Sequence, residues 1–115
     1  MHIRFERPDD RRLTAYLREG DVITEATSWQ PQQSADDLTA AVEAARTEGY
    51  GECFWPEPTG QYWWMFRLVD ARLEVAVMWT AGGASQWQHV FRAADEVNYV
   101  RNLVHAELSR QGLST

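Results

Sequence analysis

Histidine and cysteine are the side chains most often used for metal binding and nucleophilic catalysis, and this sequence keeps them far apart. The three histidines are His2, His89 and His105, and the one cysteine is Cys53. No two of them stand at the short spacings, such as His-x₃-His or Cys-x₂-Cys, that build metal sites. The sequence therefore predicts no metal site and no bound cofactor.

The remaining reactive groups also favour non-catalytic roles. Cys53 lies near Glu52 and Glu57, whose negative charge disfavours the thiolate that a nucleophile needs. Adjacent carboxylates occur three times, each at the predicted start of a helix, where they stabilise the positive end of the helix dipole. These pairs are Asp9-Asp10, Asp36-Asp37 and Asp95-Glu96. The sequence favours a binding protein over an enzyme.

Tryptophan is the most unusual feature of the composition. Five of the six tryptophans fall between residues 55 and 87. Trp63 and Trp64 are adjacent on a predicted strand, so their rings must point to opposite faces of a sheet. Because tryptophan is enriched at binding hot spots, we expect one sheet face to bind a ligand or partner. The candidate residues on that face are Trp63, Met65, Arg67, Glu74, Trp87, His89 and Phe91.

This face has two alternative interpretations. As part of a protein interface, its aromatic rings would supply the buried contacts of a complex. As the wall of a pocket, it would bind a small molecule, with apolar walls and polar groups on the same face. The walls would be Trp63, Met65, Trp87 and Phe91, and the polar groups would be Glu74, Arg67 and His89. In that case Glu74 and His89 would be an acid–base couple, and the chain would be a small-molecule-binding domain or a minor enzyme.

Charge indicates the kind of partner. The chain has a net charge of −6, and residues 19–57 alone have a balance of −8 because Arg46 is their only basic residue. Such a field repels nucleic-acid phosphates and favours a basic protein partner. We therefore expect a small acidic interaction protein, of the bacterial immunity or regulatory adaptor kind, that binds neither nucleic acid nor membrane.

Length and composition bound the fold class. A chain of 115 residues with 44% hydrophobic residues fits a single domain spanning residues 1–115. Its apolar runs are too short to cross a membrane, and its first ten residues lack the apolar stretch of a signal peptide. With one cysteine it can form no internal disulfide, so we expect a cytoplasmic protein.

Hydrophobic periodicity in the first half of the chain predicts two strands and two helices. Residues 2–6 and 22–29 alternate as strands do. Residues 8–20 fit a helix opened by Pro8-Asp9-Asp10 and ended by Gly20. A second helix begins with Ser34 as its cap and ends at Gly49.

The second half predicts a hairpin, a further strand and a helix. Residues 61–69 and 72–80 flank a turn at Asp70-Ala71, and pairing them across it places Trp64 opposite Val77 and Arg67 opposite Glu74. Residues 85–92 form a third strand, and residues 94–110 form the last helix.

Together these elements predict an α+β fold. We expect an antiparallel or mixed sheet of about five to six strands with three helices, in the order strand, helix, strand, helix, strands, helix. The predicted core contains Trp64, Phe66, Leu68, Val75, Val77, Val100 and Val104. The abundance of large aromatic residues also predicts a homodimer that buries the second sheet face.

Overall fold

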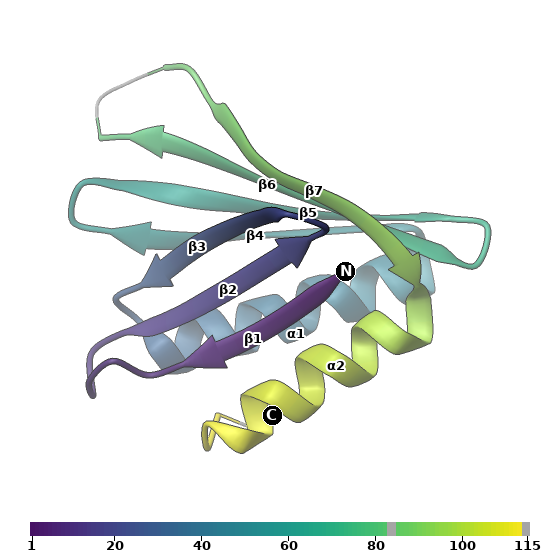
Figure 1. Cartoon of the computed structure of the whole chain (residues 1–115), viewed down its shortest axis with the longest axis horizontal. Helices are drawn as coiled ribbons and strands as arrows, with labels where there is room; N and C mark the ends of the chain where they lie inside the picture. Colours follow the sequence, from purple (N-terminus) through teal and green to yellow (C-terminus); the bar gives the residue numbers. More distant parts are fainter. Residues whose placement is uncertain (83–84, 114–115) are drawn as a thin grey trace.

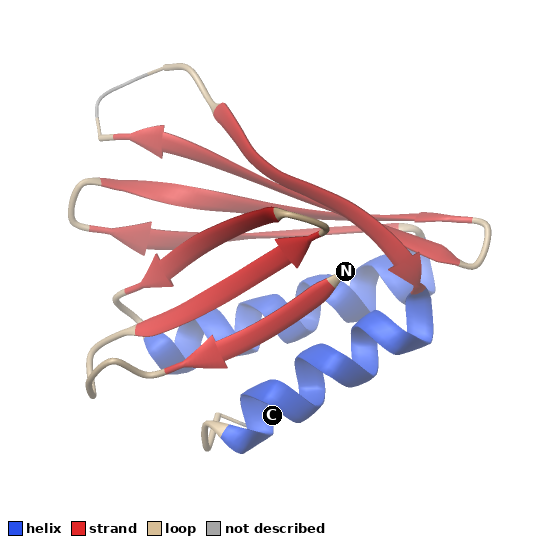
Figure 2. Cartoon of the chain, viewed as in Figure 1, coloured by secondary structure: helices blue, strands red, loops and turns tan. Residues whose placement is uncertain are grey.

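A computed structural model describes residues 1–82 and 85–113 and contains two antiparallel sheets and two helices (Figures 1 and 2). The three-stranded sheet has the order β1-β2-β3, and the four-stranded sheet has the order β4-β5-β6-β7. The elements are β1 His2–Glu6, β2 Leu13–Glu19, β3 Val22–Ser28, α1 Pro31–Glu48, β4 Tyr50–Glu57, β5 Gly60–Val69, β6 Arg72–Ala81, β7 Gln88–Glu96 and α2 Val97–Arg110.

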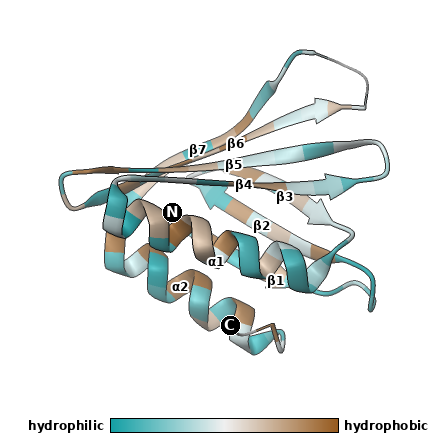
Figure 3. Ribbon diagram, turned by 180° about the vertical axis from the view of Figure 1, so that it is seen from behind, coloured by the Kyte–Doolittle hydropathy of each residue, from teal (hydrophilic) through white to brown (hydrophobic). Residues whose placement is uncertain are grey.

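Both helices and the three-stranded sheet lie on one side of the four-stranded sheet (Figures 1 and 3). Helix α1 connects the two sheets and packs on β4 and β5, and α2 packs on β1 and β7. The rings of Phe5 in β1 and Trp55 in β4 are 6.3 Å apart, so the two sheets meet in a shared core. One face of the four-stranded sheet is therefore covered, and the other is not.

The covered face supplies the two largest side chains of the core, Trp55 and Trp64. Trp55, Trp64 and Phe66 are fully buried there, where they meet apolar side chains from the three-stranded sheet and from both helices. Burial of these large rings is the main driving force for the packing of the layers. Further core residues come from β6 and β7, from the three-stranded sheet and from both helices. They include Ile3, Leu13, Leu17, Leu38, Val42, Val75, Val77, Phe91, Val100, Val104 and Leu108.

The predicted hairpin is confirmed with its register. Trp64 lies opposite Val77 and Arg67 lies opposite Glu74, and the chain reverses at Asp70, which has a φ of 57°. An aspartate tolerates this left-handed conformation better than most residues. Of the predicted core residues in this hairpin, only Leu68 is half-buried rather than fully buried.

The predicted helix over residues 8–20 is wrong. Residues 13–19 form β2, in which Leu13, Ala15 and Leu17 are all buried on the side facing the core. Pro8 and Asp9 belong to the turn before it, where the Asp9 carboxylate accepts hydrogen bonds from the Arg11 amide and the Arg12 guanidinium. The acidic residues thus stabilise a turn, and the spacing of the leucines, four residues apart, suits a strand as well as a helix.

The start of α1 also differs from the prediction. The helix begins at Pro31, a favoured residue for a first turn, and Ser34 lies inside it. Ser34 is buried and shares a hydrogen bond with the Ser28 hydroxyl at the end of β3, so it joins the helix to the strand instead of capping it. Gly49, with a φ of 96°, ends the helix as predicted.

The number and extent of elements differ too. The structure has two sheets in place of one and two helices in place of three, because 13–19 and 50–57 are both strands. Strand β7 covers residues 88–96 where 85–92 was expected, and it runs into α2 without a loop. The Glu96 side chain caps α2 by accepting a hydrogen bond from the Tyr99 amide, which explains the later start of this helix.

Candidate interaction surfaces

The uncovered face of the four-stranded sheet is the first candidate surface, and we name it the outer face. Along each strand its residues alternate with buried ones, as the pleat requires. Strand pairing arranges it in three rows that run from β4 through β5 and β6 to β7. These rows are Tyr50–Arg67–Glu74–Ala94, Glu52–Met65–Ala76–Arg92 and Phe54–Trp63–Met78–His89.

Three rings form an aromatic cluster at one end of the outer face. Phe54 stacks on Trp63 with ring centroids 5.8 Å apart, and Trp87 meets Trp63 edge-on at 5.2 Å. Trp87 also lies 6.2 Å from Phe54, whose side chain remains 41% exposed. The structure therefore brings the predicted site residues Trp63 and Trp87 together, and it adds Phe54 to them.

An ion-pair group occupies the other end. The Glu74 carboxylate is 2.6 Å from the Arg67 guanidinium across the β5–β6 ladder and 4.0 Å from that of Arg92 in β7. A shallow hollow of about 190 Å³ lies here between Tyr50, Met65 and these charged groups. It is smaller than the ~300–1,000 Å³ of typical small-molecule sites, so the pocket interpretation gains no support from its size.

Glu74 and His89 both line this hollow, but they are not in direct contact in the described part of the chain. His89 lies opposite Met78, four residues along β6 from Glu74, which is about 13 Å of strand. Within the described residues no hydrogen bond joins them, and the Glu74 carboxylate is engaged by arginine.

Phe91 does not belong to the outer face. Its side chain is 2% exposed and lies opposite Val77 in the core. In a regular strand Phe91 and His89 would share one face, but a bulge between Val77 and Met78 inserts Val90 as an extra residue. The bulge reverses the alternation, so His89 points outward while Phe91 points inward.

The second candidate surface is a groove of about 450 Å³ between α1 and the edge strand β4, which we name the acidic groove. At Gly51 the strand runs so close to the Ala41 carbonyl of α1 that a β-carbon would lie 1.9 Å from its oxygen. The lining combines carboxylates with small or apolar side chains: Asp37, Ala40, Ala41 and Ala44 from α1, and Glu52, Cys53 and Phe54 from β4.

Neither carboxylate of this groove is neutralised by an arginine within the described part of the chain. The Asp37 carboxylate accepts a hydrogen bond from the side-chain amide of Gln33 at 2.8 Å, and the Glu52 carboxylate accepts one from the Tyr50 hydroxyl at 2.6 Å. Burial, together with the charges of Asp37 and Glu52, raises the pKa of the Cys53 thiol. A raised pKa disfavours the thiolate form that a nucleophile needs, and the two carboxylates add negative charge to the groove.

Most residues of the acidic groove were not singled out from the sequence, because β4 itself was not predicted. The signal was present, since Gly51, Cys53 and Trp55 are buried while Glu52 and Phe54 between them are exposed. This is the alternation of a half-buried strand, but only the fold shows that it lies beside α1.

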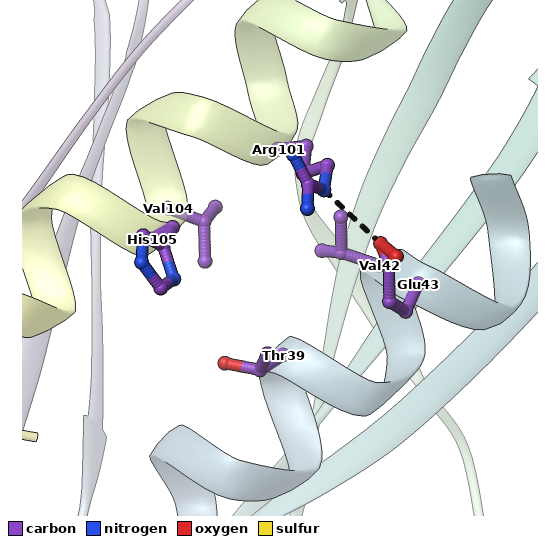
Figure 4. Close-up of a pocket in the computed structure, with 6 residues that line it drawn as sticks. All are labelled: Thr39, Val42, Glu43, Arg101, Val104 and His105. Carbon is purple, nitrogen blue, oxygen red and sulfur yellow. Dashed lines mark hydrogen bonds and ion pairs between the residues drawn. The ribbon is translucent and has the colours of Figure 1, made fainter. Parts of the chain in front are cut away.

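A third depression of about 330 Å³ lies between α1 and α2, lined by Val42, Val104, Thr39 and His105 (Figure 4). An ion pair between two of its lining residues joins the helices, with the Arg101 guanidinium 3.2 Å from the Glu43 carboxylate. Hydrogen bonding from Arg46, aided by the charge of Arg101, lowers the pKa of Glu43 to about 2. The Glu43 carboxylate is thus engaged by two arginines, and its pair with Arg101 joins α1 to α2, so we assign this groove a structural role.

Two further kinds of site find no support in the part of the chain that the structure describes. No three histidine, cysteine, aspartate or glutamate side chains there are grouped to hold a metal ion. None of the helices there has the length and apolar character needed to cross a membrane. Comparison with protein-family models, with curated proteins and with solved structures finds no match to this chain.

Proposed function

We propose that this protein is an interaction protein that binds a basic segment of another protein in the acidic groove. The observation that carries the proposal is that the groove combines two carboxylates, Asp37 and Glu52, with an apolar floor of alanines and Phe54. In the described residues these carboxylates accept hydrogen bonds from neutral groups and not from an arginine. A lysine or arginine side chain satisfies both features, because its charged end pairs with a carboxylate while its methylenes cover apolar surface.

The position of β4 supports an extended partner. Strand β4 is the edge of its sheet, with β5 as its one strand partner in the described residues, and its Pro56 carbonyl accepts a hydrogen bond from the Trp29 amide. Edge strands present backbone N–H and C=O groups to which an extended segment can add as a further strand. Such a segment, with basic residues alternating with apolar ones, would direct its basic side chains toward Glu52 or Asp37. An immunity-type or adaptor role would follow from this kind of binding.

A defined peptide tests the proposal. The probe is a ten-residue peptide that alternates arginine with valine, and its analogue with glutamate in place of arginine is the control peptide. We expect the arginine peptide to bind in isothermal titration calorimetry with an affinity that falls as salt rises, and the glutamate peptide not to bind.

Two neighbouring charge reversals make the test specific to the groove. Asp37→Arg should lower the affinity for the arginine peptide at least about tenfold, which corresponds to about 1.4 kcal/mol of binding free energy. Asp36→Arg changes the net charge equally, but Asp36 is exposed and does not line the groove, so it should have a much smaller effect. Equal effects of the two variants, or equal binding of both peptides, would show that the groove is not the binding site.

A further inference from the structure

The outer face carries an apolar surface that no helix or strand of residues 1–82 and 85–113 covers. Tyr50 and Phe54 are more than 40% exposed, and the aromatic cluster extends across β4, β5 and the residue before β7. Exposed patches of this kind mark interaction sites in soluble proteins. Glu52 and Phe54 belong both to this face and to the acidic groove, whereas Asp37 lies on α1, away from the strand rows. A second copy on the outer face would therefore engage Glu52 and leave Asp37 as the carboxylate available to a basic partner of the groove.

Charge on the outer face favours a second copy of the chain as the occupant of this face. The three rows contain Arg67 and Arg92 together with Glu52 and Glu74, so the face is neutral although the chain carries −6. Two acidic proteins repel each other least where such neutral surfaces meet. A strongly charged partner would find no complementary field here.

The order of the residues within the rows is self-complementary under one symmetry operation. Consider a two-fold axis that runs parallel to the strands, between β5 and β6, in the plane between two stacked sheets. The axis places β4 over β7 of the second copy and β5 over its β6. Sheets stacked in this way have nearly aligned strands about 10 Å apart, which is the common geometry of β-sandwiches.

This arrangement pairs each row with itself. In the middle row Glu52 faces Arg92 of the second copy, and Met65 faces the small Ala76. In the row that contains the ion pair, Arg67 faces the second copy's Glu74. Large side chains thus meet small ones and opposite charges meet, and each contact occurs twice.

In the third row the aromatic residues of β4 and β5 in one copy lie over the β6 and β7 residues of the other copy. Because Trp87 packs against Trp63 and Phe54 within one copy, Met78 and His89 of the second copy would meet this aromatic cluster as a whole. A thioether against an indole ring is a favourable contact.

The size of the face is sufficient for a specific dimer. Four strands spaced about 4.8 Å apart and up to ten residues long span roughly 19 by 33 Å, or about 600 Å² per copy. The total of about 1,200 Å² lies at the lower end of the range of specific interfaces. We propose that the chain forms a two-fold dimer through its outer faces, with Glu52 of each copy paired to Arg92 of the other.

Charge reversal at these two positions tests the arrangement. The wild-type chain should have twice its 13.3 kDa mass at micromolar concentration in native mass spectrometry and in light scattering. Glu52→Arg and Arg92→Glu should each raise the dimer dissociation constant at least about tenfold, since each single change creates two like-charge contacts. Both side chains are exposed, so folding of the variants, checked by circular dichroism, should be unaffected.

Mixing the two variants provides the decisive result. In a mixed dimer the new arginine faces the new glutamate, and the other contact is the native pair, so the mixture should dimerise although each variant alone does not. Glu48→Arg, on the exposed end of α1, is the control for net charge and should leave the dimer intact. A monomeric wild-type chain would overturn the proposal, and so would a mixture that stays monomeric.

Discussion

Replacing Gly51 with alanine tests how closely α1 is seated on β4. The new β-carbon would lie 1.9 Å from the Ala41 carbonyl oxygen, so helix and strand must separate by about 1.5 Å to reach ordinary contact. A separation of this size over two helical turns, about 11 Å long and 8 Å wide, opens roughly 130 Å³ of unfilled space. At about 24 cal/mol per Å³ this void costs about 3 kcal/mol.

Urea unfolding monitored by tryptophan fluorescence measures this cost. With an m-value of about 1.5 kcal/mol/M, the midpoint for Gly51→Ala should fall by about 2 M. Gly49→Ala is the control, because its β-carbon meets nothing within 4 Å and its cost comes only from the left-handed backbone, at about 1–2 kcal/mol. If Gly51→Ala were less destabilising than Gly49→Ala, the close approach of α1 to β4 would be wrong.

Three further changes have expected outcomes. The pKa of Glu107 is lowered by its hydrogen bond with Arg110 and by the Phe5 amide, so its contribution to stability is present above the usual value of 4.5 and is lost as pH falls below it. In urea unfolding at a series of pH values, the unfolding free energy of Glu107→Gln should therefore fall less steeply below pH 4.5 than that of the wild type. An equal fall in both proteins would contradict this. Ser34→Ala should cost about 0.5–1.5 kcal/mol in thermal or urea unfolding, because it removes one of two hydrogen bonds of the buried Ser28 hydroxyl, which still accepts from the Gln30 amide. A cost near zero would argue against the buried contact. Burial raises the pKa of Cys53, so its thiol should react with a thiol reagent at pH 8 only after urea unfolds the chain, and rapid labelling of the folded chain would refute its burial.

The parts of the fold that the sequence predicted are those fixed by local pairing. The hairpin of β5 and β6 follows from its residues alone, because only one register places Trp64, Phe66 and Val75 together on an apolar face. Strand β2 could not be predicted in the same way. Its leucines fit a helix and a strand equally well, and pairing with both β1 and β3 selects the strand.

The candidate surfaces were predictable only in part, for the same reason. Trp63 and Trp87 were expected on one face and are found there. The placement of Phe91 depends on a bulge whose extra residue, Val90, has no local signature in the sequence. The acidic groove depends on contact between α1 and β4, so it follows from tertiary packing and not from any spacing along the chain.

The first strand of the chain depends on its last helix. On the open side of β1, the Phe5 amide donates to Glu107, and the Phe5 carbonyl accepts hydrogen bonds from Arg110 and Gln111. During synthesis β1 leaves the ribosome about a hundred residues before these partners, at roughly 5–20 residues per second. For several seconds its edge is open to water and to other nascent chains. The final turn of α2 thus covers the edge of β1 only late in synthesis. A chain truncated before this turn would expose an edge strand and would be prone to aggregation.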